Sequence, residues 1–536
     1  MVYLFLFLVS LLAFLPHLGD PSPLFPQGDE VMHIRTIRES LQVNHWLVPE
    51  LTGFPNPYKP PLLFWLGIYS DRIFSIHFFW ERFVSALFGS FSTLLVYRLG
   101  FSFSNSGRMA LLLAFSFLLS FGTWKFSRLV MMEEAMVFFY LAFVTLFLKF
   151  DRDKKNLYLI LAYLTLGAGY LLKGPILIVY GLLTHFSFFL VDCIRLRKGK
   201  FFFEKDKLKH YFRQIPFVLF AFLIPVLWIS YLNFFHEYGK ALLKFFFITE
   251  NLGKFGDTNQ SFLRILGGWI LYTLPFTIPL FSVLKKGLIE PISTMKQRVG
   301  RGLLSALFLL SILHLLPNRK DPYYILPFAG LFFTLPAIYF NYEDWLSKIG
   351  SFWNQIFLIV CYLAVALFSL YLGNYFSFLL ILLFSFSISL SLYFKKNKSY
   401  VTILANLLFV PLIGFTSILP LQDPNIEQDA VFLEDTEVCV TSENPWGAMD
   451  LANRLPHHKI TYSPPSAAEA VCSAQHLPIL VFAEFYQPNE SYREVQRWFL
   501  WKLPKEFHYE DVLDLLEHPQ SLRFKKSVRY YRQEAK

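Results

Sequence analysis

Residues 1–30 read MVYLFLFLVSLLAFLPHLGDPSPLFPQGDE, and this stretch decides how the rest of the chain is organised. Residues 1–19 are almost wholly apolar and have neither a basic start nor a convincing cleavage site, which favours an uncleaved spanning helix over a signal peptide. Two adjacent carboxylates, Asp29 and Glu30, follow in a polar loop. Because charges beside a membrane are costly unless they have a function or partners, this loop is the first candidate for an active site.

The composition is that of a membrane protein. Of the 536 residues, 55% are hydrophobic and 16% are charged, which is more apolar surface than a soluble chain of this size could bury. The net charge of +10 is explained by basic cytoplasmic loops, so no nucleic-acid partner is expected. Cys439 and Cys472 lie in a polar tail, where a disulfide can form if that tail is outside the cytoplasm.

Apolar segments recur along the chain, and we predict about thirteen membrane-spanning helices. With the N-terminus in the cytoplasm, the strongly basic loops at 195–213 and 285–301 fall on the cytoplasmic side, as the positive-inside rule requires. The predicted spans are residues 1–19, 79–97, 108–123, 135–148, 156–172, 174–193, 214–233, 262–284, 302–316, 322–341, 352–372, 376–394 and 400–419.

The composition changes after residue 420, and we predict a transmembrane domain over 1–420 and a small α/β domain over 421–536 outside the cytoplasm. No nucleotide loop, zinc spacing or catalytic triad stands out in this second domain. Its predicted strands lie at 435–442, 458–463, 477–485 and 525–533, with helical patterns at 449–455 and 466–475.

Several loops on the predicted outer face carry charges at membrane boundaries. The first of these loops, residues 20–75, contains a helical pattern from Asp29 to Leu41 and then a proline-rich turn. Five short motifs follow one another on this face: Gly28–Asp29–Glu30, Tyr58–Lys59–Pro60–Pro61, SRLVMME ending at Glu133, Leu172–Lys173–Gly174–Pro175, and RKDPYYILP from Arg319 to Pro327.

These five motifs, in this order, resemble those of the GT-C superfamily of membrane glycosyltransferases. The branch they resemble contains the protein O-mannosyltransferases and the lipid A aminoarabinose transferases. The resemblance covers residues 1 to about 340 and continues in topology to residue 420. It implies the GT-C fold and an inverting transfer of a hexose or pentose from a polyprenyl-phosphate donor. The acceptor would be a lipid A-like glycolipid, a glycan or a protein on the periplasmic face of the bacterial inner membrane.

The sequence departs from the family pattern at three places. Glu133 stands where the family usually has Asp. Tyr58 stands where aminoarabinose transferases have a Glu that helps to hold a metal, and Glu250–Asn251 stands where they place a His. The resemblance therefore implies no certain cofactor, and a divalent metal remains possible.

The chemistry of such a transfer assigns roles to the charged residues. Asp29 is the candidate general base, and Glu30 and Glu133 would orient sugar hydroxyls or hold Asp29 in place. Lys59, stiffened by the two prolines that follow it, would stabilise the charge that grows on the leaving phosphate, helped by Lys173, Arg319 and Lys320. Weaker candidates for substrate contact are Tyr58, Arg128, Glu250, Asn251, Tyr323 and Tyr324.

These boundary charges also have a structural interpretation, in which they snorkel or form structural ion pairs. Asp29 is a favoured helix N-cap, and the two roles can coexist. Lys173 can stabilise a helix end. His33 lies one helical turn after Asp29, where a structural hydrogen bond is expected more often than a metal pair.

The segment 234–261 is too polar to span a membrane but carries three consecutive phenylalanines. We predict an interfacial helix and a mobile periplasmic loop over the donor cavity, with a plain surface helix as the alternative.

Two other classes of protein compete with the glycosyltransferase. A transporter or flippase of a lipid-linked glycan would favour inverted repeats with broken helices, and none is clear in the sequence. A non-catalytic scaffold would leave the boundary charges unexplained.

Overall fold

The structure is a computed structural model. It describes residues 1–43, 46–197, 200–203, 205–256, 258–371, 374–394, 398–418, 423, 426, 437–442, 445–475, 477–482, 487–488, 491–501 and 525–533. The predicted domain boundary near residue 420 falls among residues outside this part of the chain and stays a prediction. The same holds for residues 435–436 and 483–485 of two predicted strands.

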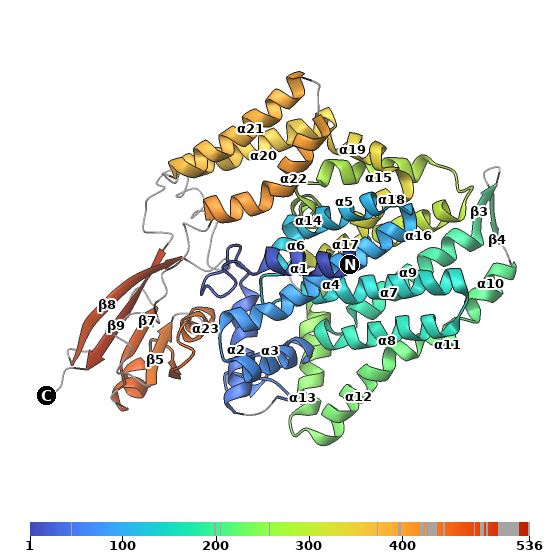
Figure 1. Cartoon of the computed structure of the whole chain (residues 1–536). Helices are drawn as coiled ribbons and strands as arrows, with labels where there is room; N and C mark the ends of the chain where they lie inside the picture. The colour runs from blue at the N-terminus through green and yellow to red at the C-terminus, as the bar shows by residue number, and fades with distance from the viewer. Residues whose placement is uncertain are drawn as a thin grey trace.

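Most of the chain forms a bundle of apolar helices whose long members lie side by side, with a small sheet at one end (Figure 1). The predicted helical membrane architecture is therefore confirmed. The first half of the bundle comprises α1 (Val2–Phe14), α3 (Leu62–Phe74), α4 (Phe78–Ser104), α5 (Gly107–Leu118), α6 (Phe121–Phe126), α7 (Glu133–Asp153), α8 (Asn156–Lys173) and α9 (Ile176–Cys193). The second half comprises α10 (Lys205–Phe212), α11 (Ile215–Val218), α12 (Phe220–Phe235), α14 (Leu263–Thr273), α15 (Thr277–Ile289), α16 (Met295–Leu313), α17 (Leu326–Thr334), α18 (Pro336–Tyr339), α19 (Tyr342–Ile349), α20 (Phe352–Tyr371), α21 (Tyr375–Phe394) and α22 (Lys398–Ile413).

Each predicted span overlaps a helix or a run of helices in the described part of the chain, but the number of thirteen crossings stays a prediction. Among the described residues, six helices are long and apolar enough to cross a membrane, or seven if the bent pair α14–α15 is one span. The predicted span over 262–284 consists of this pair, and the chain turns by 114° between α14 and α15. A short antiparallel pair, β3 (Ile194–Arg197) and β4 (Lys200–Phe203), follows α9.

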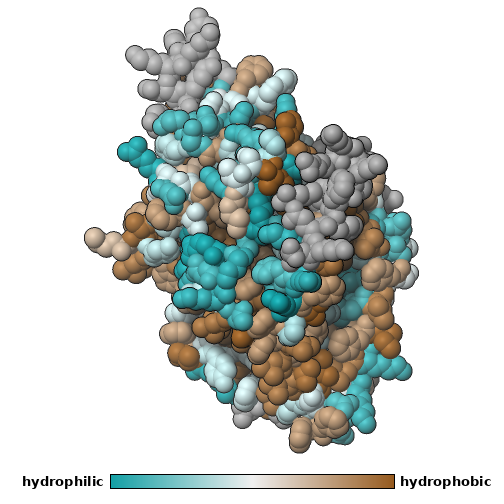
Figure 2. All heavy atoms as spheres, turned by 90° about the vertical axis from the view of Figure 1, so that its right-hand side faces the viewer, coloured by the Kyte–Doolittle hydropathy of each residue, from teal (hydrophilic) through white to brown (hydrophobic). Residues whose placement is uncertain are grey.

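The end of the bundle that lies away from the C-terminal sheet has a hydrophilic centre. Figure 2 looks onto this side, where hydrophilic residues gather centrally and hydrophobic residues surround them below. At this end Arg298 forms ion pairs with both Asp151 and Asp192. These pairs join α16 to α7 and α9, so charge as well as packing holds together the end of the bundle that carries Arg298, which we call the basic end.

The polar loop after α1 folds into α2 (Asp29–Gln42), as predicted from its helical pattern, and a short hairpin, β1 (Glu50–Leu51) and β2 (Phe54–Pro55). Two buried arginine–glutamate pairs fix α2 to α4. Arg82 Nε lies 2.8 Å from Glu30 Oε1, and Arg38 Nε lies 2.6 Å from Glu81 Oε1. Breaking a buried pair leaves an uncompensated charge, so α2 is held firmly against the start of α4.

The C-terminal domain is an α/β unit. Its sheet has the order β6-β5-β7-β9-β8, in which β5 runs parallel to β6 and β7, and β9 runs antiparallel to β7 and β8. The bounds are β5 (Glu437–Ser442), β6 (Lys459–Ser463), β7 (Ile479–Phe482), β8 (Tyr492–Trp501) and β9 (Lys525–Gln533), with α23 (Pro445–Asn453) and a π-helix η8 (Glu469–Ser473) beside them.

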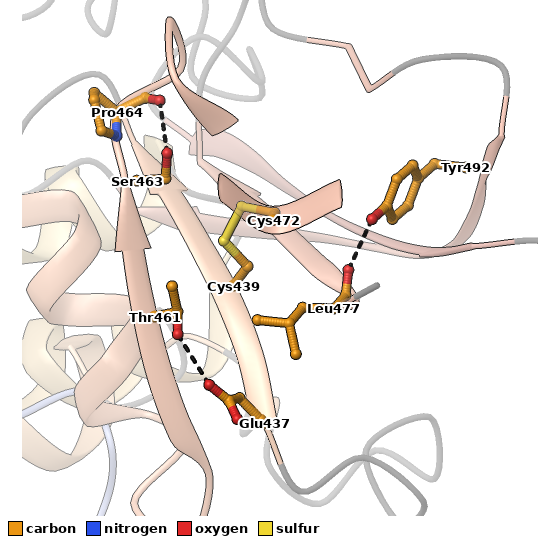
Figure 3. The surroundings of a disulfide bond; sticks show 8 residues. All are labelled: Glu437, Cys439, Thr461, Ser463, Pro464, Cys472, Leu477 and Tyr492. Carbon is orange, nitrogen blue, oxygen red and sulfur yellow. Dashed lines mark hydrogen bonds between the residues drawn. A yellow bond between two sulfur atoms is a disulfide. The ribbon is translucent and has the colours of Figure 1, made fainter. Parts of the chain in front are cut away.

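Strand β8 was absent from the sequence prediction. A disulfide joins Cys439 on β5 to Cys472 on η8, as the sequence allowed (Figure 3). Both cysteines are buried in a small apolar cluster with Ile479 and Val481, so the bond lies inside the domain.

Candidate active site

Asp29 is the first residue of α2 and faces a cavity. Gly28 is the residue that caps the helix, and no side chain caps it, so the N-cap role considered for Asp29 is not observed. A carboxylate in the first turn of a helix is stabilised by the helix dipole. The Tyr323 hydroxyl, from a 3₁₀ turn (η3, Pro322–Ile325), donates to Asp29 Oδ2 at 3.4 Å.

The cavity has a volume of about 640 Å³ and is formed by segments far apart in the sequence. A volume of this order suits a ligand of several tens of atoms. Its charged and hydrogen-bonding side chains are Asp29, His33, Thr52, Tyr58, Lys59, Glu133, Lys173, Glu250, Lys254, Arg319, Tyr323, Tyr324 and Trp446. Nine of the thirteen residues selected from the sequence are thus brought together here.

One side of the cavity is cationic, because four basic side chains from different loops line it: Lys59, Lys173, Lys254 and Arg319. Lys59 forms an ion pair with Glu250, and Lys254 Nζ lies 3.5 Å from the same carboxylate. Burial lowers the pKa of Lys254 to about 8, although the charge of Glu250 acts in the opposite direction. With more cations than carboxylates around it, the cavity is suited to a phosphate group.

Glu250 and Lys254 come from the predicted interfacial segment. This segment folds as α13 (Gly239–Lys244), a π-helix η1 (Phe245–Leu252) and a 3₁₀ turn η2 (Gly253–Phe255). Burial would raise the pKa of Glu250, but the charges of Lys59 and Lys254 outweigh this effect and lower it below 4.5. The segment therefore closes one side of the cavity through charge, and its mobility stays a prediction.

Lys173 and Glu133 form a second ion pair at the cavity, with Nζ 2.6 Å from Oε1. Lys173 is the last residue of α8, and Gly174 after it has a φ of +75°, which a residue with a side chain rarely adopts. The Lys173 ammonium also lies 5.3 Å and 5.4 Å from the ring centres of Tyr323 and Tyr324. Glu133 and the two tyrosine rings therefore hold the Lys173 ammonium in place, while it still lines the cavity.

Four predicted site residues lie elsewhere, because other partners hold them. Glu30 binds Arg82 and accepts a hydrogen bond from the Val130 amide at 2.9 Å. Arg128 donates to the carbonyls of Phe14 and Pro16 at the end of α1. Lys320 Nζ donates to Asn259 Oδ1 at 2.7 Å, and Asn251 Nδ2 donates to the Phe246 carbonyl at 2.6 Å. None of the four lines the cavity, so they position loops around it.

The sequence analysis did not select Lys254 or the wall of the cavity formed by the C-terminal domain. The only signal for Lys254 was its position one helical turn after Glu250. Pro445, Trp446 and Met449 of α23 form that wall, and Met449 packs in one apolar cluster with Leu51 of the hairpin. A helix so far along the chain carries no local sequence pattern that places it at the cavity.

The residues around the cavity do not make a metal site. Within the described ranges, no three His, Cys, Asp or Glu side chains stand together as a metal ion would require. Two of the three carboxylates at the cavity are engaged by lysines, which compete with a cation. We therefore derive no step through a metal.

Comparison with known proteins supports the family resemblance. The model of a family described as dolichyl-phosphate-mannose-protein mannosyltransferase matches residues 31–237. An uncharacterized protein of Aquifex aeolicus (strain VF5) is 29% identical over 280 residues, which cover 52% of this chain and 59% of the relative. An undecaprenyl phosphate-alpha-4-amino-4-deoxy-L-arabinose arabinosyl transferase of Serratia proteamaculans (strain 568) is 25% identical over 358 residues, which cover 63% and 60%. The chain thus spans about three fifths of the length of these curated relatives.

Two solved structures of ArnT from Cupriavidus metallidurans share the fold over nearly their whole length. The form bound to undecaprenyl phosphate has a TM-score of 0.70 and the apo form 0.67, each at 14% identity and covering 98% of this chain and 97% of that chain. The resemblance predicted from the five motifs is confirmed, and the chain has the GT-C fold of the membrane glycosyltransferases.

Proposed function

We propose that this protein is a membrane glycosyltransferase that moves a sugar from a polyprenyl-phosphate donor to a glycolipid, glycan or protein. The observation that carries the proposal is the meeting of Asp29 with four basic side chains in one cavity of about 640 Å³. The donor brings a phosphate and a sugar, and the acceptor brings a hydroxyl or phosphate oxygen. Cations for the first and a base for the second are the groups that such a transfer needs.

In the proposed reaction the acceptor oxygen attacks the anomeric carbon of the donor sugar. The bond from that carbon to the phosphate oxygen breaks, and its electron pair leaves with the polyprenyl phosphate. Lys59, Lys173 and Arg319 stabilise the added charge, with Lys254 beside them. The proton of a hydroxyl acceptor passes to the Asp29 carboxylate, and attack from the side opposite the phosphate inverts the anomeric centre.

We place the reaction on the periplasmic side of a bacterial inner membrane. The basic end of the bundle would face the cytoplasm, as the positive-inside rule predicts. The Cys439–Cys472 disulfide is typical of an oxidising compartment and supports the same orientation for the C-terminal domain. That domain contributes Trp446 and Met449 to the cavity, which favours a role in acceptor binding.

The test is to reconstitute the protein in liposomes with undecaprenyl-phosphate sugars and to measure released undecaprenyl phosphate. Asp29→Asn should slow transfer about 10²–10⁴-fold, the usual contribution of a general base. The control is Glu237→Gln, which removes an exposed carboxylate of the segment 234–261 that does not line the cavity. Release that is unchanged in Asp29→Asn refutes the base. Redistribution of intact donor without release supports the flippase instead.

A further inference from the structure

His33 is a buried side chain of the cavity wall with one nitrogen in use. It lies in α2 one turn after Asp29, and only 2% of its surface is exposed. Its Nδ1 lies 2.7 Å from the Val130 carbonyl oxygen. The Val130 amide in turn donates to Glu30, so the carbonyl that holds His33 is itself fixed. The imidazole therefore has one orientation in the cavity wall.

That contact decides which nitrogen carries the proton. A carbonyl oxygen only accepts hydrogen bonds, so Nδ1 of His33 must donate. Burial lowers the pKa of His33 below 6.5, with the charge of Asp29 acting against this effect, so the ring is neutral at pH 7. In a neutral ring with Nδ1 protonated, Nε2 has a lone pair and accepts a hydrogen bond.

No described residue donates to that lone pair. His33 Nε2 is buried and has no hydrogen-bond partner in the part of the chain that the structure describes, and the same is true of Glu133 Oε2. Both residues line the cavity beside Asp29. Buried polar atoms are nearly always hydrogen-bonded, so these acceptors indicate a ligand that brings donors.

We propose that His33 Nε2 accepts a hydrogen bond from a hydroxyl of the donor sugar. This inference rests on the proposed function. A phosphate diester offers only acceptor oxygens and the polyprenyl chain offers no polar group, so neither can donate to Nε2. The reacting hydroxyl of the acceptor has a single proton, and Asp29 takes it. The hydroxyls of the donor sugar, which every reaction of this class brings to the cavity, are the donors that we assign to Nε2, and Glu133 Oε2 is a second acceptor for them.

Two substitutions separate the cavity contact from the structural one. His33→Asn keeps an N–H close to the position of Nδ1, which can still donate to Val130, but has no atom at Nε2. His33→Gln places an amide oxygen near Nε2 and gives up the bond to Val130. We expect His33→Asn to bind the sugar-bearing lipid about tenfold more weakly, as the loss of a net hydrogen bond predicts, with undecaprenyl phosphate itself bound as in wild type. His33→Gln should retain more of the sugar preference.

The probes are undecaprenyl phosphate and the same lipid carrying mannose or 4-amino-4-deoxy-arabinose, using whichever donor wild type converts. The inference is refuted if His33→Asn binds the chosen donor as tightly as wild type, or loses sugar-bearing and bare lipid equally. It is also refuted if only the acceptor KM rises. If wild type binds undecaprenyl phosphate but converts no donor, the proposed function fails and this inference fails with it.

A second measurement covers the case in which His33→Asn does not fold. Donors that lack one hydroxyl at a time are bound to the wild-type protein. One of them should bind about tenfold more weakly than the parent donor. Where His33→Asn does fold, it should bind that deoxy donor and the parent donor equally. If every deoxy donor binds wild type as tightly as its parent, no sugar hydroxyl donates to His33 Nε2 and the inference is wrong.

Discussion

The charge of Lys254 should make donor binding depend on pH. Its pKa is lowered from 10.5 to about 8 by burial, so the cavity without ligand loses this charge as the pH rises through about 8. A bound phosphate stabilises the charged form and raises the pKa again. Binding is therefore strongest below pH 8 and weakens above it, until the pKa of the bound state is reached.

The size of the effect follows from the two pKa values. If the phosphate restores the pKa to its ordinary 10.5, the affinity for undecaprenyl phosphate falls about tenfold between pH 7 and pH 9. The phosphate monoester itself is almost fully ionised over this range, because its second pKa is about 6. Calorimetric titration of detergent-solubilised protein at pH 7, 8 and 9 measures the change directly.

Arginine at the same position supplies the comparison. Lys254→Arg keeps its charge throughout this range and should flatten the pH profile, while Lys240→Arg, a change at an exposed lysine of the same segment, should leave it unaltered. A wild-type profile that is flat between pH 7 and pH 9 would contradict the argument. So would a tenfold fall that persists in Lys254→Arg.

Three further predictions concern stability and closure. Arg82→Met removes one partner of the buried Arg82–Glu30 pair and should destabilise the folded protein by about 3–5 kcal/mol, seen as a lower melting temperature. Arg108→Gln, at an exposed arginine, is the control, and equal melting temperatures of the two variants would contradict the prediction. The Lys59–Glu250 pair contributes above pH 4.5 and is lost as the pH falls through the lowered pKa of Glu250, so spin labels on η1 and α3 should separate below pH 4.5; a constant distance from pH 7 to pH 3 would refute this. Replacing Cys439 and Cys472 by Ser opens a link across 33 residues and should cost the C-terminal domain about 3–4 kcal/mol, measured by urea unfolding; an unchanged midpoint would argue against a formed disulfide.

The pattern of hydrophobic residues was enough to predict the helices. A segment that crosses a membrane must form all its backbone hydrogen bonds internally, and its apolar run must match the thickness of the bilayer core. The bend between α14 and α15 was missed, since both arms are equally apolar. Strand β8 was missed because Phe499 and Trp501 interrupt the alternation of apolar and polar residues around the buried Trp498 and Leu500.

The site was predicted in part. Motifs show which residues share a face of the membrane, but the partners of each side chain depend on tertiary contacts. Glu30 is adjacent to Asp29 in sequence, yet it points to Arg82, because successive helical residues face different directions. Lys320 follows Arg319 and likewise turns away to Asn259.

The contact between α2 and α23 has a consequence for the C-terminal domain. Asn453 of α23 donates a hydrogen bond to the Val31 carbonyl at 2.8 Å, and its own carbonyl accepts one from Arg38. Two residues of α2, the helix that carries Asp29, are thus bonded to a residue more than four hundred positions later in the chain. Removing the C-terminal domain would take away one acceptor of the Arg38 guanidinium and one anchor of α2, although the two ion pairs with α4 would remain. A truncated protein should then transfer sugar more slowly because Asp29 is held less firmly, even if every transmembrane crossing remained in place.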